Sequence, residues 1–309
     1  MGPIIAIKQQ PSALYLTWVL NNICTNHCAY CPADLHQGQN HHYEWSHAES
    51  FSQYIIDRHP RIQLAISGGE PTLSPWFADL VKMYSLAGHP VGVTTNGARS
   101  IRYFEEIAPY LSYVVMSFHP SYEDPEFLAK TLACARSTHT TVSVMMDSRY
   151  FDRALDMFNQ LSQHPELGVN HVRIQDWRAR TYTGSEYTPE QHLFMDSMPR
   201  VHRRRSPQVR NPSVMGARTV DASGLSKALD AQQLINQKAT DFSGWSCSIG
   251  LESLFVRYDG GIRSGNCHSA PELGRIQDLA SIKWPTEPII CPQNYCDCAT
   301  DVYVSKQRI

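Results

Sequence analysis

Apolar and polar residues follow two different rhythms in the first 177 residues of the chain. Short apolar runs are typical of buried strands, and the stretches between them repeat apolar residues at the spacing of amphipathic helices. The predicted strands are residues 13–20, 62–66, 90–95, 112–117, 140–146 and 171–175. The predicted helices are residues 46–58, 76–86, 100–108, 124–135 and 150–162. This alternation with short links predicts an α/β fold on a parallel sheet, open or closed toward a barrel.

The rhythm changes after residue 177. Residues 178–245 are rich in Arg, Ser, Gln and Pro, and only residues 223–238 have a helical pattern. Further on, two alternating runs flank Asp259-Gly260 and predict a hairpin. Residues 275–282 fit a short helix. We therefore expect one domain over residues 1–215 and a second, smaller one over residues 216–309.

Composition and charge exclude few functions. The formal net charge is −2, so total charge gives no reason to expect a polyanionic partner. No apolar run approaches the roughly 20 residues that span a bilayer. The first residues lack the basic region and the cleavage site of a signal peptide. A cytoplasmic protein is the expectation.

The 9 cysteines are clustered. Three lie between positions 24 and 31, five lie between 247 and 298, and Cys134 stands alone at helical spacing. An odd number in a chain of this size and expected compartment argues against a full set of disulfides and favours metal binding. Cys134 is expected to be a small buried apolar residue.

The first cluster has the spacing C-x3-C-x2-C and directly follows the first predicted strand. Cys24, Cys28 and Cys31 supply three thiolates on one tight loop. Three thiolates suit an iron–sulfur cluster with one open iron, whereas a structural zinc site needs a fourth ligand. His27 lies between two of the cysteines and leaves the zinc alternative open.

Together with further motifs in order, this loop resembles that of the radical S-adenosylmethionine (SAM) superfamily. Tyr30 precedes the third cysteine, Gly68-Gly69-Glu70-Pro71 ends the second strand, Thr94–Gly97 ends the third, and Ser117 ends the fourth. The resemblance implies a partial (β/α)6 TIM-type barrel over about residues 13–177. It also implies a 4Fe–4S cluster on the three cysteines. The residues implied to contact SAM are Tyr30, Gly68, Gly69, Glu70, Pro71, Thr95, Asn96, Ser117 and Gln175.

The second cysteine group resembles the twitch and SPASM extensions of that superfamily. It comprises Cys247, Cys267, Cys291, Cys296 and Cys298, around the predicted hairpin. The resemblance implies one auxiliary 4Fe–4S cluster, which takes four of the five cysteines. The fifth is either a buried thiol or a hydrogen-atom donor to a substrate radical, with Cys291 as the candidate. A structural zinc site is the remaining alternative.

The resemblance further implies reductive cleavage of SAM to a 5′-deoxyadenosyl radical, with an electron donor such as flavodoxin or ferredoxin. The expected outcome is oxidation, bond formation, epimerisation or isomerisation of a peptide, amino-acid-derived, sugar or modified-nucleotide substrate. No leader-peptide-binding domain is evident before residue 13, which makes a peptide less expected. His119, after the fourth strand, is a candidate for substrate binding or proton transfer.

A different class of function stays open. The chain fits a zinc- or cluster-stabilised binding protein in which the arginines between Arg200 and Arg210 contact a nucleotide or nucleic acid. A solvated segment is the other interpretation of these arginines.

Overall fold

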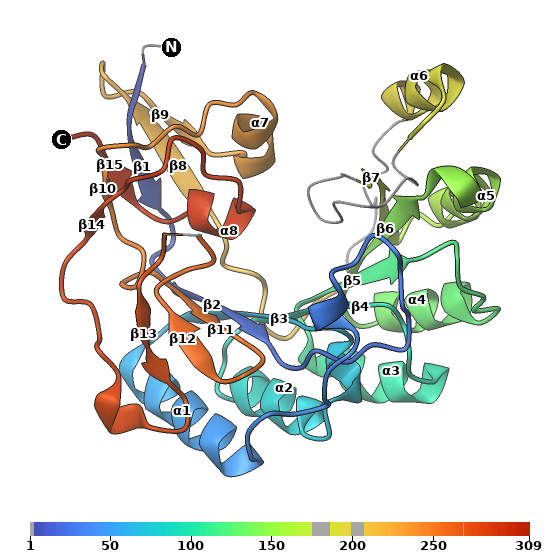
Figure 1. Cartoon of the computed structure of the whole chain (residues 1–309), viewed down its shortest axis with the longest axis horizontal. Helices are drawn as coiled ribbons and strands as arrows, with labels where there is room; N and C mark the ends of the chain where they lie inside the picture. Colours follow the sequence, from blue (N-terminus) through green and yellow to red (C-terminus); the bar gives the residue numbers. More distant parts are fainter. Residues whose placement is uncertain (1–2, 175–185, 199–206, 268) are drawn as a thin grey trace. The chain divides into compact units, whose positions relative to one another are not determined.

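The computed structural model describes residues 3–174, 186–198, 207–267 and 269–309 (Figure 1). These residues form two compact units. We call Leu20–His41 with Ile66–Pro212 the central unit. The terminal unit comprises Met1–Val19, His42–Ala65 and Ser213–Ile309. The boundary passes through strand β3 (Ile62–Ser67).

The central unit is built on parallel strands. The strands β4 (Val91–Thr95), β5 (Tyr113–Phe118), β6 (His139–Met146) and β7 (Leu167–Arg173) are neighbours in this order. Each pairs with the next in parallel. Every second residue of β6 is buried, as expected for a strand with one face in a core.

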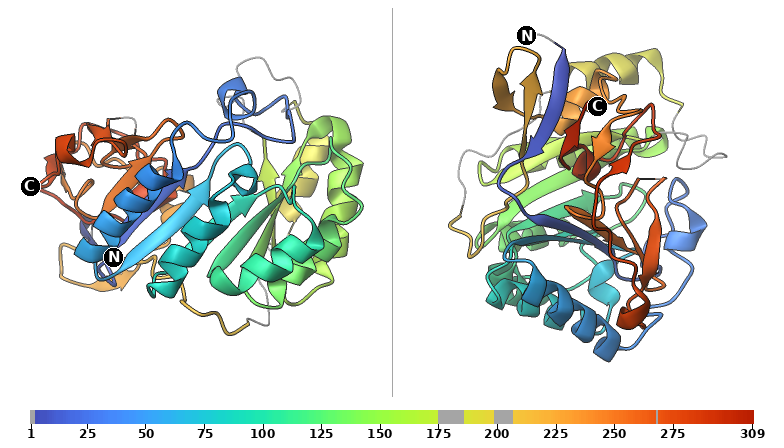
Figure 2. Two further views of the ribbon diagram at one scale, coloured as in Figure 1. Left: turned by 90° about the horizontal axis from the view of Figure 1, so that it is seen from below. Right: turned by 90° about the vertical axis from the view of Figure 1, so that its left-hand side faces the viewer.

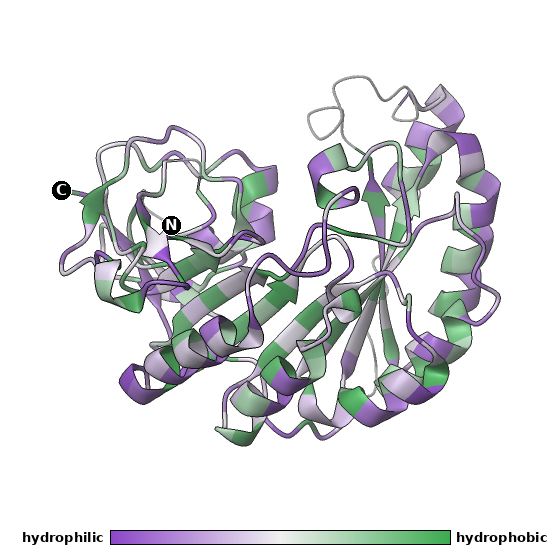
Figure 3. Ribbon diagram, turned by 60° about the horizontal axis from the view of Figure 1, so that its bottom comes forward, coloured by the Kyte–Doolittle hydropathy of each residue, from purple (hydrophilic) through white to green (hydrophobic). Residues whose placement is uncertain are grey.

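Helices precede, separate and follow these strands along the chain. They are α2 (Phe77–Leu86), α3 (Ile101–Ile107), α4 (Phe127–Ala135), α5 (Phe151–Ser162) and α6 (Pro189–Ser197). The helix α5 shows why they form: Phe151, Ala154, Phe158 and Leu161 are buried at spacings of three and four residues. In Figure 2, helices α2 to α5 lie along one face of the strands. The helices alternate hydrophobic and hydrophilic residues, whereas the strands between them are mainly hydrophobic (Figure 3).

The terminal unit joins segments from the beginning, the middle and the end of the chain. One sheet has the order β13 (Glu272–Arg275), β12 (Gly261–Arg263), β11 (Ser253–Val256), β2 (Leu14–Val19) and β3. The strands β11 and β2 pair in parallel, and β11 and β12 form the predicted hairpin. Helix α1 (Trp45–Arg58) buries Phe51, whose ring meets Trp18 edge-on with centroids 5.5 Å apart.

A second sheet of the terminal unit is built largely from short strands. Its order is β14 (Ile289–Ile290), β10 (Ser246–Cys247), β15 (Lys306–Gln307), β1 (Ile4–Gln9), β8 (Ala217–Asp221) and β9 (Ser226–Ala228). Helices α7 (Ala231–Asn236) and α8 (Ala299–Val302) complete the unit.

Most predicted elements of the first 177 residues are present, but two later predictions are wrong. The helix expected over residues 223–238 is interrupted, because Gly224 turns the chain at φ +83° and Asp221 accepts hydrogen bonds from the backbone of Ser223 and Leu225. Only α7 is helical there. Of residues 275–282, a single 3-10 turn at Leu279–Ser281 forms. None of the helices that the structure describes is long and apolar enough to cross a membrane.

Candidate active site

The loop of the first cysteine cluster is bound to the Gly-Gly-Glu-Pro loop by backbone hydrogen bonds. The amide of Leu20 donates to the carbonyl of Ser67 at 2.8 Å, and Gly69 donates to Asn21 at 3.0 Å. Glu70 continues the pattern with a bond to the carbonyl of Ile23 at 2.7 Å. These bonds extend the strand-like pairing beyond β3. They hold Ile23, the residue before Cys24, in a fixed place.

Gly69 is required by close approach of the backbone. A Cβ atom at this position would lie 2.3 Å from the carbonyl oxygens of both Ile23 and Leu35. At Gly68 it would lie 2.7 Å from Oδ1 of Asn21. Any side chain at Gly69 would therefore push the cysteine loop away from its neighbour.

Glu70 is fully buried and ties three segments together. Its Oε1 accepts from the hydroxyl of Thr72 at 2.6 Å and from that of Thr95 at 2.7 Å, and its Oε2 accepts from the amide of Asn96 at 2.7 Å. Burial raises the pKa of Glu70, while these hydrogen bonds act in the opposite direction. Much of its accepting capacity is used inside the protein, so a contact with the SAM ammonium group stays a prediction.

Asn96 connects the end of β4 to the first cysteine. Its side-chain amide donates to Sγ of Cys24 at 3.3 Å and to the hydroxyl of Thr25 at 3.1 Å. The backbone amide of Asn26 also donates to Cys24 Sγ, at 3.3 Å. Burial raises the pKa of Cys24, and these donors act in the opposite direction because they favour the thiolate form, which is the form that binds metal.

Cys28 lies beside a histidine and a tyrosine. Its Sγ is 3.4 Å from Nδ1 of His119, and the hydroxyl of Tyr30 is 2.6 Å from the same nitrogen. Burial raises the pKa of Cys28 to about 12 and lowers that of His119 to about 4. A thiolate at Cys28 therefore requires a positive partner such as iron.

The third cysteine of the donor set lies beside the second. Cys31 closes a tight turn by donating from its amide to the carbonyl of Cys28 at 2.9 Å, and it packs against Cys28 and Tyr30. Over the described ranges, no three His, Cys, Asp or Glu side chains converge as ligands of one metal ion. In a 4Fe–4S cluster each cysteine binds a different iron, so such convergence is not needed.

The other predicted contacts are near or outside this region. Thr95 ends β4, Pro71 begins a 3-10 turn, and Ser117 lies near the end of β5. Gln175 lies outside the described residues, as do the arginines at 200, 203, 204 and 205.

Tyr122 was missed from the sequence. Its hydroxyl accepts a hydrogen bond from the backbone amide of His27 at 2.5 Å. The only signal was its place three residues after His119, in the same segment following β5.

One family model matches the part of the chain that contains this site. Residues 18–164 match the model described as the Radical SAM superfamily. This segment, which includes the first cysteine cluster and the Gly-Gly-Glu-Pro loop, is thus similar to radical SAM domains. No curated protein matches the sequence.

Solved structures with a similar fold include proteins bound to S-adenosylmethionine. SuiB from Streptococcus suis bound to S-adenosylmethionine has a TM-score of 0.55 and 10% identity, and the match covers 89% of this chain and 66% of SuiB. The same protein bound to precursor peptide SuiA has a TM-score of 0.55 at 10% identity, over 90% of this chain and 66% of SuiB. Native anSMEcpe with bound AdoMet and Cp18Cys peptide has a TM-score of 0.51 at 14% identity, over 87% and 79% of the two chains. This chain thus spans slightly under two thirds of the length of SuiB.

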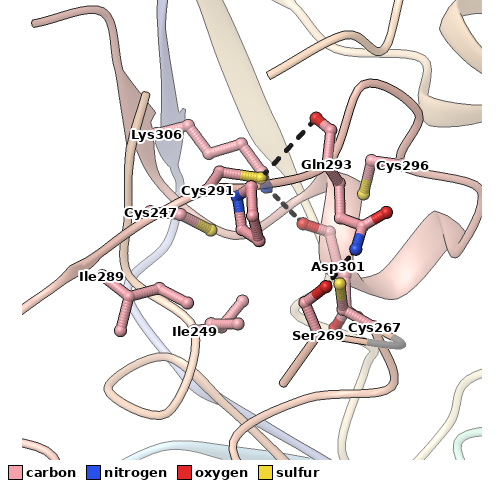
Figure 4. A pocket seen from close by; sticks show the side chains of 11 residues that line it. Cys247, Ile249, Cys267, Ser269, Ile289, Cys291, Gln293, Cys296, Asp301 and Lys306 are labelled. Atoms are coloured by element: carbon pink, nitrogen blue, oxygen red, sulfur yellow. Dashed lines mark hydrogen bonds between the residues drawn. The ribbon is translucent and has the colours of Figure 1, made fainter. Parts of the chain in front are cut away.

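Outside the residues that match the radical SAM model, four cysteines line one cavity in the terminal unit. They are Cys247, Cys267, Cys291 and Cys296, and the apolar side chains of Ile249 and Ile289 lie beside them (Figure 4). Burial raises the pKa of Cys247 and Cys267, and that of Cys296 to about 12. Four thiols around one space can ligate a 4Fe–4S cluster, whereas a zinc ion would need them to converge further than they do among the described residues.

Cys298 does not line this cavity. It is half-buried, and its Sγ accepts a hydrogen bond at 3.3 Å from the side-chain amide of the exposed Asn266. The sequence pointed to Cys291 as the spare cysteine because Cys296 and Cys298 are close in sequence. The lining of the cavity includes Cys291 and leaves out Cys298. Cys134 is fully buried in α4, as predicted.

Proposed function

We propose that this chain is a radical SAM enzyme whose Cys24, Cys28 and Cys31 hold a SAM-binding 4Fe–4S cluster. The observation that carries the proposal is the clamped cysteine loop. Backbone bonds hold its first residues against Gly69 and Glu70, and Asn96 donates to Cys24. When bound, the cluster and SAM supply a 5′-deoxyadenosyl radical that abstracts hydrogen from a substrate carbon.

The residues around the loop are positioned to organise this chemistry. Gly68 and Gly69 let backbone atoms approach a ligand closely, and Tyr30 and Ser117 lie in segments proposed to contact SAM. Burial lowers the pKa of His119, so in the free protein its neutral imidazole has one donor and one acceptor nitrogen, and the tautomer decides which of the two Nδ1 is. The parallel strands of the central unit are proposed to belong to a partial (β/α)6 barrel, whose strand ends carry these loops.

We propose a second 4Fe–4S cluster in the terminal unit, on Cys247, Cys267, Cys291 and Cys296, in a twitch-like domain. Four thiols and apolar walls surround the cavity, which supports complete cysteine ligation. A fully ligated cluster has no open iron, so its role is electron transfer. An external one-electron donor of the flavodoxin or ferredoxin class supplies the first cluster.

Among the expected substrates, a peptide has the most support. Both SuiB and anSMEcpe, which have the same type of fold, were solved with peptides bound. With a second cluster to accept an electron, oxidation or bond formation is the favoured outcome, and epimerisation or isomerisation is the competing one.

Metal analysis and isotope labelling test this function. Anaerobically reconstituted protein is expected to hold about eight irons and no zinc. Zinc in place of iron would support the competing metal-stabilised binding protein.

Incubation with SAM and candidate peptides in heavy water then separates the outcomes by mass spectrometry. Loss of two hydrogens indicates oxidation, and a gain of one mass unit indicates epimerisation.

A further inference from the structure

We propose that the buried ammonium group of Lys306 is the counter-charge of an anionic four-cysteine centre in the terminal unit and raises its reduction potential. This inference rests on the second cluster of the proposed function. It assigns a role to a charged residue that neither the sequence motifs nor the SAM site explains.

Lys306 is placed directly against the cysteine cavity. It lies in β15 opposite Cys247 of β10 in the antiparallel register. Its side chain lines the same cavity as the four cysteines, and Figure 4 shows it beside Cys247 and Cys291. Only 3% of Lys306 is exposed. Its charge therefore acts on the cavity without screening by water.

The described surroundings of Lys306 offer it dipoles but no direct ion pair. Its Nζ donates to the carbonyl oxygens of Asp301 and Val304, the latter at 3.0 Å, and lies 5.2 Å from the centre of the Phe242 ring. Within the described part of the chain, no carboxylate oxygen lies within 4.0 Å of this nitrogen. The buried carboxyl group of Asp301 lines the same cavity and interacts with Lys306 from beyond that distance. A buried ammonium group is costly unless an anion compensates it.

An anionic centre in the cavity would add to the longer-range compensation that Asp301 gives. Four cysteine thiolates outweigh the positive charge of the cluster core, so a fully ligated 4Fe–4S centre is anionic and becomes more negative on reduction. A nearby cation stabilises the more negative state, which raises the reduction potential. Lys306 thus makes the centre easier to reduce, as an acceptor of substrate electrons requires.

The inference is tested by a redox titration of the second centre alone. Replacing Cys24, Cys28 and Cys31 by Ala removes the first cluster and leaves the terminal cysteines intact. In this background we compare Lys306→Gln and Lys306→Met with Lys306→Arg, and we follow the reduced cluster by electron paramagnetic resonance. Lys283→Met is the matched control, because it removes an exposed lysine of the same unit.

The neutral variants are expected to shift the reduction equilibrium at least about tenfold against the reduced form, which is a midpoint about 59 mV lower. Lys306→Arg and Lys283→Met are expected to keep the parent midpoint. Loss of iron from both folded neutral variants, with retention in Lys306→Arg, would also support the counter-charge.

Two results would overturn the inference, and they differ from each other. An unchanged midpoint in iron-loaded Lys306→Gln refutes the role of Lys306 and leaves the second cluster standing. A parent background without iron, or with zinc, refutes the second cluster itself and the inference with it.

Discussion

At the scale of single residues, the cysteine spacings identify the chemistry but not every partner. Cys24, Cys28 and Cys31 are legible because their spacing is local. The contacts of Asn96 with Cys24 and of Tyr122 with His27 join residues far apart in sequence. For Glu70, the motif predicts a site residue but not its hydrogen-bond partners. Only the fold reveals that its carboxylate accepts from Thr72, Thr95 and Asn96.

The ligand set of the second centre is the residue-scale prediction. Cys298→Ala is expected to keep the second cluster, because Cys298 contacts Asn266 outside the lining of the cavity. Cys291→Ala, whose side chain lines the cavity, is expected to lose it. Iron and sulfide are counted in both variants after anaerobic reconstitution. Full iron in Cys291→Ala with loss in Cys298→Ala would reverse the assignment.

At the scale of elements, a buried lysine of α4 joins two segments of the candidate active site. Lys130 donates to the carbonyl of Gly97 at 3.1 Å and to Oδ2 of Asp124 at 3.0 Å. Gly97 follows Asn96, and Asp124 belongs to the segment that begins with His119. The side chain of Lys130 is only 9% exposed, so these bonds are protected from water.

Lys130→Met is expected to destabilise the protein by about 2 kcal/mol and to weaken SAM binding, since it frees the segment that carries Asn96. Arg136→Gln is the matched control. It breaks an exposed ion pair between the same helix and Glu105, which is worth about 0.5 kcal/mol. Thermal unfolding and equilibrium binding of SAM measure both effects. Equal SAM affinity in Lys130→Met and the control would show that Lys130 does not position the segment that carries Asn96.

Elements were predictable where their pattern is local and strong. The amphipathic period of α5 and the alternation of β6 are visible in sequence and present in the structure. The wrong helix over residues 223–238 was predicted from a helical pattern, and a turn at Gly224 overrides that pattern. The strand β1 was missed because it pairs with β8 and β15, far away in the chain.

At the scale of the whole molecule, the terminal unit combines both ends of the chain. The strand β2 pairs in parallel with β11, and Tyr15 both donates to and accepts from the backbone of Gly216. Sequence patterns contain no signal for pairings across more than 200 residues, so the predicted division at residue 215 could not anticipate them. That division remains a prediction about evolutionary domains.

A truncated chain tests this interdependence. Residues 1–212 alone are expected to be insoluble or unfolded, because β2 loses its neighbour β11 and β1 loses β8 and β15. Soluble yield and circular dichroism are compared with the full chain. A soluble, cooperatively unfolding fragment of residues 1–212 would show that these pairings are dispensable.

The most direct test of the central claim is formation of 5′-deoxyadenosine. Anaerobically reconstituted protein is incubated with SAM and dithionite, and the products are separated by liquid chromatography. We expect 5′-deoxyadenosine and methionine in equal amounts, and neither product above background in Cys28→Ala. Iron-loaded protein that leaves SAM intact, or a Cys28→Ala variant that cleaves SAM as fast as the parent, would contradict the assignment of Cys24, Cys28 and Cys31.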